Sequence, residues 1–153
     1  MTLLNLLVGL PVMLLCLVVQ VASLFWSVRF YMRNSTGNLR GQGFLSGIRP
    51  LVAVTLVMMF VNLVQIALWG GLFLWLGEFV QPYDAMYHSA VNFTSLGYGD
   101  VVMSRNRKLL GPLEAVNGVL MLGMTAAALM AIVQHMIQSY GDAMPADRVD
   151  GRA

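Results

Sequence analysis

One stretch decides the fold of this chain: residues 81–100, which read QPYDAMYHSAVNFTSLGYGD. Residues 84–94 predict a helix of about 16 Å, at about 1.5 Å per residue, which is too short to cross a membrane. Pro82 precedes this helix, and Asp84 is placed to cap its first turn. Non-helical backbone at membrane depth is tolerated only where it is buried in protein or lines a water-filled path. Residues 95–99 therefore predict the loop of a re-entrant segment.

Apolar stretches lie on both sides of this segment and at the start of the chain. No Asp, Glu, Lys or Arg occurs in residues 1–28, 51–77 and 115–141 of the 153. Each stretch exceeds the roughly 20 residues that a helix needs to cross about 30 Å of hydrocarbon. The composition agrees, with 58% hydrophobic and 10% charged residues. The sequence thus predicts an all-α membrane protein with three transmembrane helices and one re-entrant helix and loop.

Charge and cysteine content exclude several other classes of protein. The net charge is only +2 and the basic residues are scattered, so they indicate membrane orientation rather than nucleic-acid binding. The single cysteine, Cys16, allows no intrachain disulfide and no cysteine-based zinc site. No residue pattern supports covalent catalysis, so we expect neither an enzyme nor a cofactor.

The basic residues predict an orientation in the cell (inner) membrane. Four arginines lie between the first and second apolar stretches, and two follow the third: Arg29, Arg33, Arg40, Arg49, Arg148 and Arg152. The connection between the second and third stretches has only three basic residues, namely Arg105, Arg107 and Lys108. Because cytoplasmic loops carry an excess of Lys and Arg, residues 29–50 and the C-terminus are expected inside, with the N-terminus and residues 78–114 outside. Aromatic residues at the expected boundaries are candidate interfacial anchors, namely Trp26, Phe30 and Tyr31 inside and Trp69, Trp75 and Tyr83 outside.

Residues 94–100, Thr94-Ser95-Leu96-Gly97-Tyr98-Gly99-Asp100, resemble the selectivity filter of potassium channels, whose signature is Thr-Val-Gly-Tyr-Gly. The order of outer helix, short helix, filter, aspartate and inner helix in residues 51–140 is also similar to that family. Within it, the chain resembles the small bacterial potassium-channel-like proteins of the ion-channel family that includes two-pore-domain channels. A potassium ion that has lost its water needs a ring of oxygen ligands. Stacked backbone carbonyls can form such rings when the backbone dihedrals alternate, and glycine adopts the required dihedrals freely.

The resemblance implies passive K⁺ conduction across the lipid bilayer by a homotetrameric pore. One filter copy per chain means that three identical subunits must join each chain to close the ring. The implied ion ligands are the backbone oxygens of the filter and the side-chain hydroxyl of Ser95, which is the innermost ligand. The residues concerned are Thr94, Ser95, Leu96, Gly97, Tyr98 and Gly99. Tyr98 is expected to point away from the axis and to brace the filter against the short helix.

The apolar stretches, together with the resemblance over residues 51–140, divide the chain into four parts. Residues 1–28 form a first transmembrane helix that packs peripherally against the second, and residues 29–50 form a cytoplasmic connector. Residues 51–140 form the pore domain, and residues 141–153 form a short cytoplasmic tail. In the pore domain, the short helix at 84–94 is the pore helix and residues 95–99 are the filter.

Two departures from the family pattern leave alternatives open. Ser95 replaces threonine and Leu96 replaces valine or isoleucine, so a stiff β-branched side chain is missing at both positions. A weakly selective cation channel is one alternative. A membrane scaffold or regulatory subunit that does not conduct, yet retains a channel-like sequence, is another.

Residues around the filter have both a supporting and a plain interpretation. Tyr87 and His88 occupy positions where the family often has an aromatic cuff, and Asp100 is placed to accept a hydrogen bond from the Tyr87 hydroxyl. The plain interpretation makes Tyr87 an interfacial anchor and Asp100 a solvated acid. His88 is either a packed ring or a titrating sensor.

The third apolar stretch carries the remaining candidates. Gly118 and Gly123 are candidate gating hinges, or else small residues that allow close helix packing. Leu122, Ala126 and Met130 are candidates for lining an inner cavity. Pro112 and Glu114 fit the first turn of this helix, where proline is tolerated and an acid favours the positive end of the helix dipole.

Overall fold

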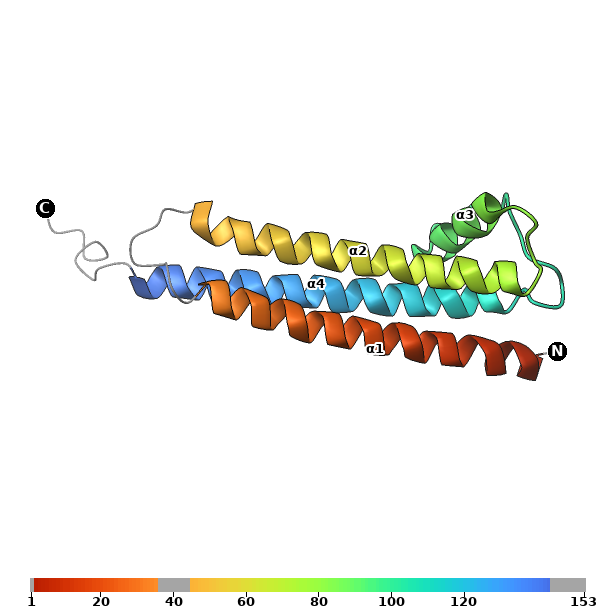
Figure 1. The fold of residues 1–153 in the computed structure, drawn as a ribbon, viewed down its shortest axis with the longest axis horizontal. Coiled ribbons are helices and arrows are strands. Elements are labelled where there is room, and N and C mark those ends of the chain that lie inside the picture. Colours follow the sequence, from red (N-terminus) through yellow and green to blue (C-terminus); the bar gives the residue numbers. More distant parts are fainter. Residues whose placement is uncertain (1, 36–44, 144–153) are drawn as a thin grey trace, which may run out of the picture.

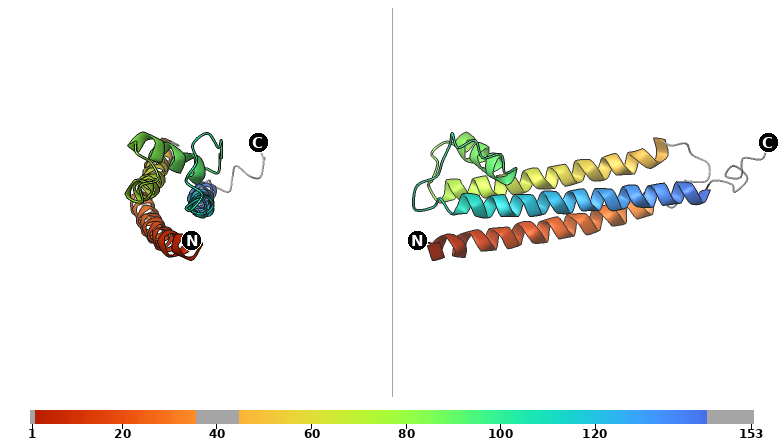
Figure 2. Two further views of the ribbon diagram at one scale, coloured as in Figure 1. Left: turned by 90° about the vertical axis from the view of Figure 1, so that its right-hand side faces the viewer. Right: turned by 180° about the vertical axis from the view of Figure 1, so that it is seen from behind.

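Four helices make up the part of the chain that the structure describes. The structure is a computed structural model and describes residues 2–35 and 45–143. The helices are α1 (Thr2–Ser35), α2 (Leu45–Trp75), α3 (Pro82–Phe93) and α4 (Leu110–Ala143). The three long helices lie side by side along the long axis (Figure 1). In the view along that axis α4 lies to one side of α1 and α2, and α1 contacts both of the other long helices (Figure 2).

The lengths of the helices confirm an integral membrane protein with three candidate spans. Thr2–Arg33, Ile48–Trp75 and Leu110–Gln138 are each long and apolar enough to cross a bilayer. The 12-residue α3 is too short to do so and lies at one end of the bundle, where α1 begins (Figure 1). The predicted all-α class with one short helix between the second and third spans is therefore confirmed.

Several predicted helix ends are wrong. α1 continues to Ser35 instead of ending at residue 28, and α2 begins at Leu45 instead of residue 51. The predicted connector at 29–50 is therefore helical at both ends. Residues 36–44 of the connector and residues 144–153 of the predicted tail lie outside the described residues, and so do Arg40, Arg148 and Arg152. Charges marked the predicted ends, but a helix satisfies its own backbone and has no need to stop at the membrane surface.

The short helix α3 also differs from its predicted limits of 84–94. It begins at Pro82, where the missing N–H costs nothing because the first helical amides have no partner. Gln81 occupies the N-cap position and makes no side-chain capping bond. The prediction that Asp84 caps the helix is therefore wrong; Asp84 lies inside the first turn, where its charge favours the positive end of the helix dipole.

Two clusters of buried side chains hold the long helices together. Near α3, Cys16 of α1 packs with Trp69 and Phe73 of α2. At the opposite end, Tyr31 of α1 packs with residues of α2 and α4, and its ring meets that of His135 edge-on. Trp69 and Tyr31 were predicted as membrane anchors and are instead buried, because Trp69 packs against α1 and Tyr31 packs against α2 and α4.

A buried hydrogen-bonded network also joins α1, α2 and α4. The Gln20 amide of α1 donates to Thr125 Oγ1 at 2.9 Å and to the Met121 carbonyl at 3.2 Å, both on α4. Gln65 of α2 donates to Gln20 Oε1 at 2.8 Å. The predicted packing of the first helix against the second is thus incomplete, since α1 contacts α4 as well.

Replacing Gln20 by leucine is expected to destabilise the protein in detergent. Leucine is nearly isosteric but leaves Gln65 and Thr125 without their shared partner, which costs about 1–2 kcal/mol of unfolding free energy. Gln134→Leu, the same change at an exposed position of α4, is the control. The midpoint of unfolding in SDS measures both; an equal midpoint for the two variants contradicts a role for the network.

Candidate functional site

Residues 94–100 leave the end of α3 as an exposed, non-helical segment. The backbone φ is positive at every second residue: 57° at Ser95, 62° at Gly97 and 74° at Gly99. Glycine adopts such values without a Cβ penalty, as expected for residues 97 and 99. Ser95 is the one non-glycine residue with positive φ in the described chain, and its conformation was not predicted.

Backbone hydrogen bonds join the amides at the start of this segment to the last turn of α3. The Ser95 amide donates to the Asn92 carbonyl at 2.8 Å, and the Leu96 amide donates to the Val91 carbonyl at 2.9 Å. The Gly97 amide also reaches the Val91 carbonyl, at 3.4 Å. Within the described residues, no carbonyl of residues 95–99 accepts a hydrogen bond. The amides are thus tied to α3, while the carbonyls remain available as ligands.

The side chains of the segment differ in what they contact. The Thr94 hydroxyl donates to the Ala90 carbonyl at 2.7 Å, back toward α3, which leaves the backbone carbonyl of Thr94 as its candidate ligand. Leu96 is exposed, and Tyr98 is 67% exposed. The predicted packing of Tyr98 on the short helix is therefore not made within one subunit.

A hydrogen bond joins Tyr87, in the middle of α3, to Asp100, at the end of the segment. The Tyr87 hydroxyl donates to Asp100 Oδ2 at 2.7 Å. This bond raises the pKa of Tyr87 to about 12 and holds the pKa of Asp100 below its usual 3.8. The predicted hydrogen bond is therefore present, while its role in supporting the filter stays a prediction.

His88 is a packed ring. It is 7% exposed and lies against Phe73 and Phe79. Its Nδ1 lies 2.8 Å from the Val101 carbonyl and so donates the N–H, while Nε2 accepts from the Asn92 amide at 2.9 Å. A neutral ring satisfies both contacts, and burial lowers its pKa below the usual 6.5. The packed alternative is the one that these contacts favour.

The lowered pKa of His88 predicts how stability depends on pH. Below pH 6.5 the unfolded chain binds a proton at His88 more readily than the folded chain does, so stability is full above that pH and falls as the pH decreases. Unfolding midpoints measured between pH 7.5 and pH 5.5 are expected to fall for the wild type and to change less for His88→Gln. Equal slopes would assign the pH dependence to another group.

Glu114 is a buried acid behind α3 whose contacts were not predicted from the sequence. Glu114 of α4 is 0% exposed, and its Oε1 accepts a hydrogen bond from Ser89 of α3 at 2.5 Å. The Ser89 hydroxyl also lies 2.7 Å from the Ile66 carbonyl of α2. Glu114 lies beyond the first turn of α4, so its predicted role at the helix end is wrong. The Ser89 hydroxyl of α3 therefore contacts both α2 and α4. The position of Glu114 beside an apolar stretch did not indicate this contact in the sequence.

A second missed contact joins the end of α2 to the segment that follows residue 100. Glu78 accepts hydrogen bonds from the Ser104 amide at 2.8 Å and from the Ser104 hydroxyl at 2.9 Å. Arg107 Nε lies 3.3 Å from Glu78 Oε1 in an ion pair. This clip holds the loop between the candidate filter and α4 in place.

The two candidate hinge glycines of α4 differ in their surroundings. A Cβ on Gly118 would lie 1.9 Å from the Phe93 carbonyl oxygen at the end of α3, whereas a Cβ on Gly123 would meet no atom within 4 Å. The contact supports the packing interpretation for Gly118, and a hinge at either glycine stays a prediction. Leu122, Ala126 and Met130 are all exposed in the isolated chain and lie one turn apart on α4; their role in lining a cavity stays a prediction.

The comparisons with known proteins agree with this arrangement. Residues 61–135 match the family model described as "Ion channel". The match runs from the middle of α2 through α3 and residues 94–100 into α4, and no curated protein or solved structure matches the chain. Residues 61–135 therefore form an ion channel domain of that family, which is a family of channels and not of enzymes.

Proposed function

We propose that this chain forms a homotetrameric pore that conducts K⁺ passively through residues 94–99. The observation that carries the proposal is the segment itself: positive φ alternates along residues 95–99, and their carbonyls accept no hydrogen bond within the described residues. Four such segments around one axis supply stacked rings of oxygens, which replace the hydration shell of the ion. In this proposal Tyr87, His88 and Asp100 support the filter.

The stoichiometry follows from the single filter copy in each chain. One strand cannot surround an ion, so four chains close the ring. The exposed apolar side chains along α2 and α4 give each subunit a surface to cover with neighbours or lipid. Native mass spectrometry in mild detergent is the experiment; tetramers support the proposal, and a stable monomer or dimer contradicts it.

The filter end of the bundle is proposed to face the outside of the cell membrane. Arg29, Arg33 and Arg49 lie toward the other end, and Lys and Arg are enriched on the cytoplasmic side. α1 begins at the filter end (Figure 1), so the N-terminus is then outside. The C-terminal tail is then cytoplasmic.

A weakly selective K⁺/Na⁺ channel is the second candidate, because Ser95 and Leu96 lack the β-branched stiffness of threonine and valine. We expect Ser95→Thr combined with Leu96→Val to raise the preference for K⁺ by holding the carbonyls more firmly. Reversal potentials under bi-ionic conditions measure the permeability ratio. An unchanged ratio would show that these two positions are neutral for selectivity.

A scaffold or regulatory subunit that does not conduct is the alternative from another class. It shares the fold and the tetramer, so only a conduction measurement separates it from a channel. Reconstituted protein without ion flux in K⁺ or Na⁺ gradients would favour the scaffold.

A further inference from the structure

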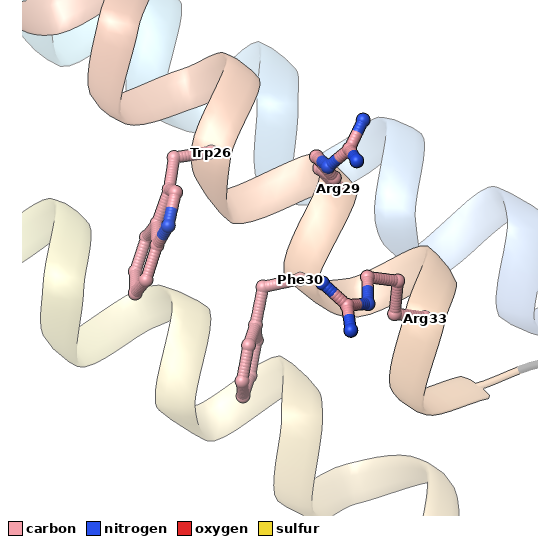
Figure 3. Close-up of a pocket in the computed structure, with 4 residues that line it drawn as sticks. All are labelled: Trp26, Arg29, Phe30 and Arg33. Carbon is pink, nitrogen blue, oxygen red and sulfur yellow. The ribbon is translucent and has the colours of Figure 1, made fainter.

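A second group of side chains lies on α1 at the end of the bundle opposite α3. Trp26, Arg29, Phe30 and Arg33 share one face of the helix and line a hollow of about 320 Å³. The two rings are stacked, with centroids 5.9 Å apart and planes 19° apart. Figure 3 shows both rings directed toward α2, with the guanidinium group of Arg33 beside Phe30 and that of Arg29 directed away from the rings.

The positive charge of this group has no acidic partner within residues 2–35 and 45–143. Arg29 and Arg33 are exposed, and neither has a hydrogen-bond or ion-pair partner among the residues that the structure describes. Both lie at the end of a helix that is apolar enough to span a membrane from Thr2 to Arg33. Arginine residues at the end of a spanning helix are expected at the headgroup level of the bilayer.

The hollow continues into an apolar crevice. Trp26 and Phe30 also line a space of about 70 Å³ between α1 and α2, together with Ser27, Ala53, Val54 and Val57. The same two rings thus separate a cationic region from an apolar one. An amphiphile with an anionic head and a hydrocarbon tail matches both regions, whereas a free anion matches only the first.

We propose that Arg29 and Arg33 bind the phosphate group of an anionic phospholipid, whose glycerol and upper acyl chain lie against Trp26 and Phe30. Guanidinium groups bind phosphate through paired hydrogen bonds, and aromatic rings favour the headgroup level of the bilayer. The site adjoins the cluster around Tyr31, where α1 meets α2 and α4. A bound lipid there contacts α1 and α2 at the end far from the filter, whether or not the pore conducts.

Native mass spectrometry of the purified protein tests this site with phosphatidylglycerol, with phosphatidylcholine of the same acyl chains, and with inorganic phosphate. The wild type is expected to retain phosphatidylglycerol in preference to phosphatidylcholine. Arg29→Gln with Arg33→Gln is expected to weaken phosphatidylglycerol binding about 25-fold, because each arginine near an anionic surface contributes about fivefold.

Two further variants make the result specific. Arg105→Gln with Lys108→Gln removes the same charge from exposed residues at the other end and should bind phosphatidylglycerol like the wild type. Trp26→Leu keeps both arginines but removes a ring, so it should weaken binding even if the double arginine variant does not assemble. Equal phosphatidylglycerol binding by the wild type, Trp26→Leu and the double arginine variant overturns the proposal. Retention of phosphatidylcholine equal to phosphatidylglycerol, or displacement of the lipid by inorganic phosphate, overturns it as well.

Discussion

Gly97→Ala is expected to abolish ion conduction while leaving the tetramer intact. Gly97 has a φ of 62°, in the left-handed region, where an added Cβ costs about 1–2 kcal/mol in each subunit. No neighbouring atom lies within 4 Å of the position of that Cβ, so backbone strain and not a clash drives the change. Relief of the strain turns the peptide, and a turned carbonyl breaks a ring of ion ligands.

Gly71→Ala is the matched control for this variant. Gly71 also has no neighbour within 4 Å of its Cβ position, but it lies within α2 and has no positive φ. Flux through reconstituted protein should therefore be retained in Gly71→Ala and lost in Gly97→Ala, with both variants tetrameric by native mass spectrometry. Robust K⁺ current through Gly97→Ala would show that the filter is assigned to the wrong residues.

Gly118→Ala is expected to disrupt the junction between α3 and α4. The added Cβ would lie 1.9 Å from the carbonyl oxygen and 2.7 Å from the carbonyl carbon of Phe93, so one of the two helices must move. Overpacking of this kind costs about 1–3 kcal/mol in each subunit. Since Phe93 is the last residue of α3, the shift reaches the candidate filter directly, and both stability and conduction should fall.

Gly123→Ala provides the comparison on the same helix. Its Cβ position is open within the subunit, so the unfolding midpoint should match the wild type. A wild-type midpoint for Gly118→Ala would contradict close packing at that residue. Altered opening in Gly123→Ala at unchanged stability is the result that a hinge at Gly123 predicts.

The order of the helices was predictable because the bilayer constrains it strongly. A charge-free stretch of more than about 20 residues has few alternatives to a spanning helix, and the 12-residue helix between two such stretches is too short to span. The positive φ at Gly97 and Gly99 was equally expected from the residue type. The positive φ of Ser95 was not expected, because serine seldom adopts the left-handed region and nothing in the sequence indicates that Ser95 does so.

The packing partners of individual side chains were not predictable. Large apolar residues are spread around α2, so its sequence does not show which face α1 covers, and Trp69 was assigned to the lipid interface instead of the core. Glu114 fitted the end of a helix equally well in sequence, and only the fold brings it to Ser89. The ends of α1 and α2 were not predictable either, because both helices extend past the charge-free stretches that marked the predicted ends.

Single-channel recording from the reconstituted wild-type protein tests the central proposal most directly. With K⁺ on one side of the bilayer and Na⁺ on the other, four filter segments that ligate K⁺ through carbonyls predict unitary currents with a reversal potential displaced toward the K⁺ equilibrium potential. A reversal potential near zero would instead show a pore that does not distinguish the two ions. The absence of unitary current from verified tetramers would contradict conduction through residues 94–99.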